Sequence, residues 1–256
     1  ILRQSLSFLL IAYAHLVYAQ TAVTITFEMN GNAAVIDTSM LGNIWQKGTP
    51  QKSFLDSAHS VPYSITTDSL SPYPINNLSS FRIVIKEPVP GVWGSNVVPY
   101  LYFYHKYDTD TLLDGGYIEF SYDGGTTWLH AFNASELIWK DPPPTSMITG
   151  GITAFTGRSQ MQVSWDSWRD CWMSWNGWCG LTSGQVPADS IIVKFTFKSD
   201  GIQTNKDGWA IDDITYGTSN SNCFLGLEEI VSTRLNMLIY PNPTNEILTG
   251  KVSRLG

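Results

Sequence analysis

Apolar and polar residues alternate along several short stretches of this chain, and a helical repeat of apolar positions is nearly absent. Strict alternation over four to eight residues is typical of a β-strand with one buried face. Gly, Pro and Asn residues separate these stretches, as expected for an all-β domain of two packed antiparallel sheets. The pattern predicts strands over residues 23–27, 81–85, 99–105, 117–122, 126–130, 191–197 and 208–214.

Two of these stretches form a predicted hairpin. Residues 117–122 and 126–130 flank the tripeptide Asp123-Gly124-Gly125. A tight turn between antiparallel strands needs residues that adopt positive φ, which Gly does without steric cost.

Composition changes the picture in one respect. Charged residues make up 14% of the chain and the net charge is −7, with no basic run. An average globular chain carries about 25% charged residues. This balance excludes nucleic acid as a partner and suits an exported domain with a polar, mostly neutral surface.

The first residues have the features of a secretory leader. Arg3 supplies a positive charge, residues 6–18 are apolar, and Val17-Tyr18-Ala19 is a small-x-small cleavage site. We therefore expect residues 1–19 to be a signal peptide. Neither this stretch nor any later one predicts a transmembrane segment.

A short motif near the other end points to the export route. Residues 238–245 read Leu-Ile-Tyr-Pro-Asn-Pro-Thr-Asn. An apolar strand entering Tyr-Pro-Asn-Pro resembles the opening of the C-terminal sorting domain that Bacteroidetes proteins carry for type IX secretion. The resemblance implies recognition by that secretion machinery. We expect residues 234–256 to be the start of such a small β-sandwich domain, truncated here, and residues 219–233 to be a linker.

The region between leader and linker resembles a second family. The motifs are Phe27-Glu28, Trp45-Gln46-Lys47-Gly48-Thr49-Pro50, the segment 114–128 and the segment 208–214. Together, in this order, they look like a MAM-like module of exported bacterial proteins, often found beside peptidases. The resemblance implies a jelly-roll β-sandwich of concanavalin-like topology over residues 20–218.

The same resemblance implies a calcium ion held by a first-strand Glu and the acidic pair of the last strand. Calcium takes six to eight oxygen ligands. The chemically apt residues are Glu28, Asn30, Asp114, Asp212 and Asp213. Neighbouring residues of a strand point to opposite faces, so only one of Asp212 and Asp213 is expected to face the ion. The alternative is that this pair caps a turn or pairs with Arg82 or Lys194.

A tryptophan-rich stretch supplies the candidate ligand site. Five of the ten Trp residues lie within residues 165–179. Exposed indole rings stack on sugar faces, and nearby polar groups can bind hydroxyls. The predicted contacts are Trp168, Arg169, Trp172, Trp175, Asn176 and Trp178. The alternative is that some of these rings belong to the core, or form the apolar stripe of a short helix.

The spacing of the cysteines suggests that a disulfide bond stabilises this stretch. Cys171 and Cys179 are the closely spaced pair, and a disulfide between them would close a short loop in an oxidising compartment. Cys223 is then left over in the linker, either free or joined to another chain.

Catalytic motifs are missing: the sequence has no His-Glu-x-x-His, Gly-x-Ser-x-Gly or P-loop pattern. Glu28, Glu119, Asp123 and Glu136 are the carboxylates to weigh for glycoside hydrolysis, which needs a pair of them across one cleft. The sequence therefore favours a secreted or surface-bound, non-catalytic adhesion protein that recognises an extracellular glycan. The alternatives are a surface or accessory module that binds protein, and a divergent glycan hydrolase.

Overall fold

The computed structural model describes residues 22–28, 34–88, 90–94, 97–140, 144–159, 168–181 and 184–220, and the strand backbone at 238–239 and 250–251. The signal peptide prediction, Asn30, Cys223 and most of the predicted linker lie outside these residues. In the described part of the chain, no helix is long and apolar enough to cross a membrane.

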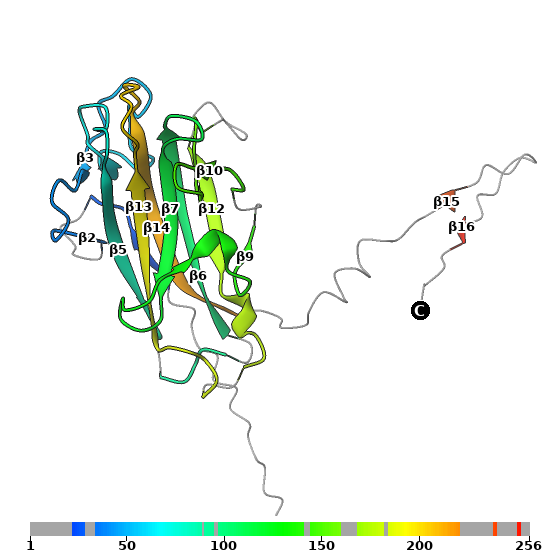
Figure 1. Ribbon diagram of the computed structural model, residues 1–256. Coiled ribbons are helices and arrows are strands. Elements are labelled where there is room, and N and C mark those ends of the chain that lie inside the picture. The colour runs from blue at the N-terminus through cyan, green and yellow to red at the C-terminus, as the bar shows by residue number, and fades with distance from the viewer. Residues whose placement is uncertain are drawn as a thin grey trace, which may run out of the picture.

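Two antiparallel sheets form the molecule (Figure 1). The larger, seven-stranded sheet has the order β3-β4-β14-β6-β12-β9, and β1 also pairs with β14. Its strands are β1 (Val23–Ile25), β3 (Trp45–Gly48), β4 (Ser64–Thr67), β6 (Val97–Asp108), β9 (Ile138–Trp139), β12 (Arg169–Ser174) and β14 (Gly208–Asn220).

The smaller sheet has five strands in the order β2-β5-β13-β7-β8. They are β2 (Ala34–Ile36), β5 (Leu78–Lys86), β7 (Gly115–Ser121), β8 (Leu129–His130) and β13 (Ser190–Lys198). The long strands β5, β6 and β7 alternate between the two sheets along the chain, as do β12, β13 and β14. The fold is a jelly-roll antiparallel β-sandwich, which confirms the predicted fold class.

Shorter elements complete the described structure. The chain forms two 3-10 turns, η1 (Ala131–Asn133) and η2 (Asn176–Trp178), and two small ladders. One ladder joins β10 (Met147–Ile148) to β11 (Ile152–Thr153), and the other joins β15 (Leu238–Ile239) to β16 (Gly250–Lys251). The apolar pair of the predicted sorting motif, residues 238–239, is thus a strand.

Each predicted strand overlaps an observed one, although the strands predicted over 23–27 and 126–130 cover only residues 23–25 and 129–130. β13 pairs with β5 over nine residues, and both strands bury alternating apolar side chains in the core. The predicted hairpin is present as β7 and β8, with Glu119 opposite His130. Its turn is held by Asp123, whose carboxylate accepts the backbone N–H groups of Thr126 and Thr127.

The core lies between the two inner sheet faces. Phe81 and Phe195 stack with ring centroids 4.8 Å apart, and Phe103 meets Phe195 edge-on at 5.3 Å. Fully burying one such ring stabilises the fold by about 1.5–3 kcal/mol. Trp209 is fully buried in this core. A Cβ atom on Gly116 would lie 2.1 Å from the Trp209 indole ring. Only glycine fits at position 116.

A second, smaller cluster covers part of the outer face of the larger sheet. Leu55 packs with Trp168 and Ala210, and Phe54 and Tyr104 border them. These contacts bring the segment 52–60, which leads into β4, onto strands β6 and β14.

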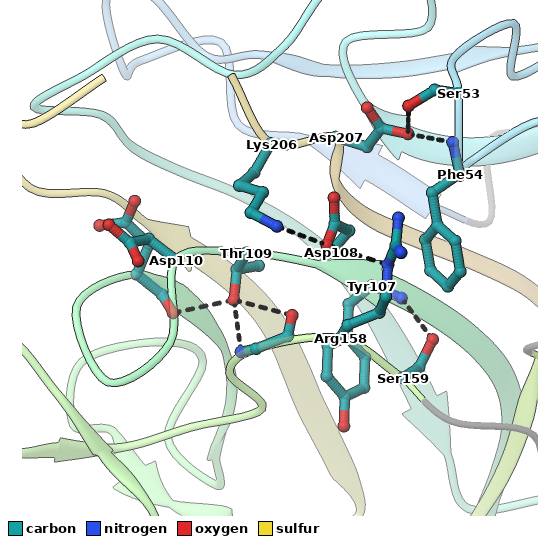
Figure 2. A network of polar contacts seen from close by, with 12 residues as sticks. Ser53, Phe54, Tyr107, Asp108, Thr109, Asp110, Arg158, Ser159, Lys206 and Asp207 are labelled. Carbon is teal, nitrogen blue, oxygen red and sulfur yellow. Dashed lines mark hydrogen bonds and ion pairs between the residues drawn. The ribbon is translucent and has the colours of Figure 1, made fainter. Parts of the chain in front are cut away.

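Buried charges fix this segment in place (Figure 2). The Asp207 carboxylate accepts the N–H groups of Phe54 at 2.6 Å and Leu55 at 2.9 Å. Lys52 Nζ donates to the carbonyls of Thr67 and Asp207, and burial lowers the pKa of Lys52 to about 8. These bonds satisfy groups that would be costly to bury unpaired.

The neighbouring carboxylate of Asp108 extends the same network. It pairs with Lys206 and Arg158, each at 3.2 Å. The Arg158 guanidinium also lies 4.1 Å from the centroid of the Phe54 ring, so the segment is held by a cation–π contact as well.

Candidate functional site

The tryptophan-rich stretch is mostly a strand and a 3-10 turn, not an exposed loop. β12 and η2 cover residues 169–174 and 176–178. Trp168, Trp175 and Trp178 are 6%, 0% and 3% exposed. Trp175 packs edge-on against Phe120, and Trp178 packs against Trp93. These three rings are therefore not available to a ligand in this structure, and the alternative that Trp168 is a core residue is correct.

The other three predicted contacts diverge because β12 is extended. Trp172 faces the outer side of the sheet, whereas Arg169, three residues earlier, opposes His105 on the inner side. The Arg169 side chain hydrogen-bonds to Tyr107. Asn176 opens η2 and is only partly buried. Trp172 and Arg169 therefore point to opposite faces of the sheet, although both line one cleft at its edge, and Asn176 does not line that cleft.

Trp172 is part of a row of side chains that crosses four neighbouring strands. It lies opposite Tyr102 on β6, and Tyr102 lies opposite Thr215 on β14. Thr215 in turn lies opposite Thr24 on β1, with the two hydroxyl oxygens 2.9 Å apart. Directly opposed residues of antiparallel strands share a face. We call Thr24, Thr215, Tyr102 and Trp172 the cross-strand row.

Thr24 is exposed and the other three members of the row are half-exposed, whereas the residues that flank Tyr102 along β6 are buried. Along β6, Tyr100, Tyr102 and Tyr104 are intermediate in exposure, whereas Leu101 and Phe103 are fully buried. The three tyrosines therefore share the outer face. Tyr102 and Tyr104 meet edge-on with centroids 5.2 Å apart.

Two carboxylates border this surface. Burial raises the pKa of Tyr102, and the hydrogen bond to Tyr104 and the charges of Asp170 and Asp213 raise it further. Asp170 pairs with Lys140 at 2.6 Å, and Asp213 pairs with His59 at 2.6 Å. The His59 ring also stacks on Tyr104 with centroids 3.6 Å apart. Tyr102 thus stays a neutral phenol that can donate and accept hydrogen bonds.

An edge cleft of about 200 Å³ adjoins Trp172 where β12 meets β9. Its walls are mainly aromatic, with one cation and one carboxylate, Asp170, at the margin. The lining includes His105, Tyr107, Trp139, Phe155, Arg169 and Trp172. Burial lowers the pKa of His105 to about 3, so this ring is neutral. The cleft has the mixture of aromatic surface and a few polar groups that is typical of small-ligand sites.

The structure brings some of the predicted calcium ligands near one another. The charges of Asp213 and Glu28 add to the effect of burial, which raises the pKa of Asp212 to about 7. Asp114 lies with a different set of residues, because its carboxylate accepts the Tyr73 hydroxyl at 2.8 Å and the Asp200 N–H at 2.7 Å.

The described residues alone do not assemble a calcium site. In the part of the chain that the structure describes, no group of three or more His, Cys, Asp or Glu side chains could hold a metal ion. The Asp212 carboxylate accepts the backbone N–H groups of Ser60 and Asp213, both at 2.8 Å. With Asn30 outside the described residues, the calcium assignment stays a prediction.

A β-bulge changes the predicted geometry of the acidic pair. The ladder between β14 and β6 shifts register between Asp212 and Thr215, and Asp213 has a φ of 47°. Asp212 accepts the Ser60 N–H at 2.8 Å, while Asp213 contacts His59. Both carboxylates therefore contact the segment 52–60. Among the described residues, neither pairs with Arg82 or Lys194, and Lys194 pairs with Glu119 instead.

The predicted Cys171–Cys179 bridge is wrong. Cys179 is disulfide-bonded, whereas Cys171 is not part of a disulfide and lines the edge cleft.

Sequence reasoning missed Tyr102, Thr215 and Trp139. The alternating run 99–105 held the signal for Tyr102, because its outward tyrosines are visible in the sequence. Their meeting with Trp172 depends on strand register, which no local pattern gives. Trp139 reaches the cleft through the two-residue strand β9, which is too short to predict.

No family model and no curated protein matches the chain. Among solved structures it is similar to the K1 cleaved adhesin domain of Lys-gingipain from Porphyromonas gingivalis W83, with 10% identity over 77% of this chain and 97% of that one, at a TM-score of 0.38. It is also similar to the C-terminal CBM6 of LamC, a marine laminarinase from Zobellia galactanivorans, with 16% identity over 77% and 99% and a TM-score of 0.32. A third structure is the catalytic domain of a GH87 α-1,3-glucanase in complex with tetrasaccharides, with 10% identity over 77% and 28% and a TM-score of 0.27. Similarity at this level assigns no function.

Proposed function

We propose that this protein is an exported, non-catalytic binding protein that recognises carbohydrate on the outer face of its larger sheet. The observation that carries the proposal is the pairing of half-exposed Trp172 with half-exposed Tyr102, beside the carboxylate of Asp170. Aromatic rings offer flat apolar faces with a polar handle, and carboxylates accept hydrogen bonds from hydroxyls. A sugar ring presents both kinds of surface.

Binding without catalysis is supported by the surroundings of the carboxylates. Glu119 pairs with Lys194 at 3.0 Å, and the turn residue Asp123 accepts hydrogen bonds from its own hairpin. At the proposed site, Asp170 and Asp213 are each paired with a base. Glycoside hydrolysis needs two carboxyl groups that face the scissile bond across one cleft, whereas each of these carboxylates contacts a partner of its own.

Export is part of the proposal. The leader pattern, the Tyr-Pro-Asn-Pro motif and the disulfide at Cys179 all support an extracellular, oxidising location. Delivery by the type IX machinery to the cell surface or the medium follows from the sorting-domain resemblance.

A glycan array probed with the full chain tests the proposal. We expect binding to a defined set of saccharides, loss of that binding in Trp172→Ala, and retention in Tyr63→Ala. Tyr63 is the control because it is an exposed aromatic, 40% accessible, that follows the segment 52–60 rather than lying in the row. Bound saccharides should be recovered uncleaved. An array without signal, or equal signal from wild type and Trp172→Ala, would contradict the proposal.

A further inference from the structure

The cross-strand row is longer than one sugar ring. Thr24, Thr215, Tyr102 and Trp172 lie in register on β1, β14, β6 and β12. Neighbouring strands are about 4.8 Å apart, so the row spans about 14 Å from first to last strand. The edge cleft beside Trp172, in contrast, holds about 200 Å³, which is below the ~300–1,000 Å³ of sites for drug-sized ligands. The volume of the cleft is suited to a single sugar ring, whereas the length of the row is suited to an oligosaccharide.

The two ends of the row offer different chemistry. Tyr102 and Trp172 present aromatic surface, and Thr215 and Thr24 present hydroxyls that already contact each other at 2.9 Å. Each hydroxyl has one donor and two acceptor positions, so the pair keeps hydrogen-bonding capacity after that contact. A ligand that stacks at one end and hydrogen-bonds at the other matches this order.

The two flanks of the row differ. Next to Tyr102 on β6, the half-exposed Tyr100 lies opposite Gly217, which contributes no side chain. On the opposite flank, Tyr104 carries the stacked His59 ring of the segment 52–60. A chain crossing the strands would therefore have the Tyr104 and His59 rings on one side and Tyr100 on the other.

Charge restricts the kind of chain. The row contains no Lys or Arg, and Asp170 and Asp213 act on Tyr102 at its centre. The nearby bases, Lys140 and His59, are paired with those two carboxylates. A carboxylate or sulfate group on a ligand would lie near the Asp170 and Asp213 carboxylates with no Lys or Arg in the row to pair with, and like charges oppose binding.

We propose that the row is the binding path for a neutral, linear glycan that crosses the strands, with one ring stacked at Trp172 and Tyr102 and later units hydrogen-bonded to Thr215 and Thr24. This inference rests on the proposed carbohydrate function and specifies its ligand class.

Calorimetry with neutral linear oligosaccharides of one to six units tests the path. The probes are the cello-, laminari-, manno-, xylo- and chito-oligosaccharides, together with oligogalacturonides as acidic counterparts. For the full chain, we expect affinity to rise with length in one neutral series and to stay undetectable for the acidic series. The double variant Thr24→Val/Thr215→Val should lose about fivefold in affinity or more for the longer members and nothing for the shortest member that binds.

The variants separate the inference from the proposed function. Val keeps the shape of Thr and favours strands, so folding is preserved, and an unchanged Tm verifies this. Tyr102→Phe, which removes only a hydroxyl, is the matched control within the aromatic half and should weaken every length equally. Binding that needs Trp172 but gains nothing with length would overturn the path and leave the carbohydrate function standing. Tighter binding of oligogalacturonides would overturn the neutral class, and no binding of any series would overturn both.

Discussion

Trp172 on β12 lies directly opposite Tyr102 on β6, and both side chains are half-exposed on the outer face of the larger sheet. Three residues further along the chain, Trp175 is fully buried against Phe120. Two tryptophans of one short stretch thus have opposite roles, because strand alternation and the turn that follows it direct them to different places.

The first prediction compares the two tryptophans. Trp175→Ala leaves a large cavity and should lower the free energy of unfolding by about 3–5 kcal/mol. Trp172→Ala removes a half-exposed ring and should cost about 1 kcal/mol or less, while abolishing saccharide binding. Urea denaturation of both variants measures the stabilities. Equal losses of stability would contradict the assignment of Trp172 to the surface.

The second prediction concerns acid stability through His105. Burial, with Arg169 nearby, lowers the pKa of His105 to about 3, and Trp209 Nε1 donates to His105 Nδ1 at 3.3 Å. The unfolded histidine, with a pKa near 6.5, takes up a proton that the folded one refuses. Stability is therefore complete above pH 6.5 and is lost as the pH falls below it, by about 2 kcal/mol from this group between pH 7 and 5.

His105→Gln checks that assignment, since Gln keeps an acceptor for the Trp209 indole but does not titrate. Urea denaturation at pH 7 and pH 5 should show a pH-dependent loss about 2 kcal/mol smaller in the variant than in the wild type. The same loss in both proteins would mean that His105 is not held neutral.

The third prediction concerns Asp212. Its pKa is raised to about 7 by burial and by the charges of Asp213 and Glu28. Because the folded carboxyl holds its proton more tightly than the unfolded one, stability from this group is full below pH 3.8 and is lost as the pH rises through 7. Asp212→Asn keeps an acceptor for Ser60 and should raise Tm by ~2–4 °C or more at pH 8 and change little at pH 4.

The same variant decides the calcium hypothesis. A bound calcium ion would need the Asp212 charge, so the Asn variant would then melt earlier than the wild type in calcium, and chelator would lower only the wild-type Tm. The hydrogen-bonding geometry around Ser60 predicts a chelator-insensitive melt for both proteins.

The fourth prediction concerns the cysteines. The disulfide involves Cys179 and not Cys171. Cys171→Ser should therefore keep the mass increase of two protons on reduction, and Cys179→Ser should lose it. Intact-mass spectrometry before and after reduction gives both results. A bridge that disappears in Cys171→Ser would restore the pairing expected from sequence spacing.

Local patterns predicted the sandwich but not the site. The runs in β5, β13 and β7 alternate so regularly that their strands and inward faces follow from the sequence. The strand β12 could not be predicted in this way, because tryptophans occupy both inward and outward positions around it and hide the alternation. The directions of the Asp212 and Asp213 side chains were predicted wrongly for another reason. The bulge after Asp212 interrupts the strand, so these neighbours do not point to opposite faces.

Register is the information that the sequence lacked. Thr24 and Thr215 are 191 positions apart, yet they meet because β1 and β14 pair. A shift of one residue in that ladder would turn Thr24 away from the row and expose Ile25. The cross-strand row therefore exists only at the level of the assembled sheet.

The most direct test of the central claim is to watch the indole N–H groups while a saccharide binds. The chain has ten tryptophans, and ¹⁵N–¹H spectra resolve their Nε1–H signals, with Trp172→Phe and Trp175→Phe providing assignments. On titration with the strongest neutral oligosaccharide from the array, we predict that the Trp172 signal shifts in proportion to occupancy and that the buried Trp175 signal does not move. Saturable binding that leaves the Trp172 signal in place would contradict a glycan site on this face.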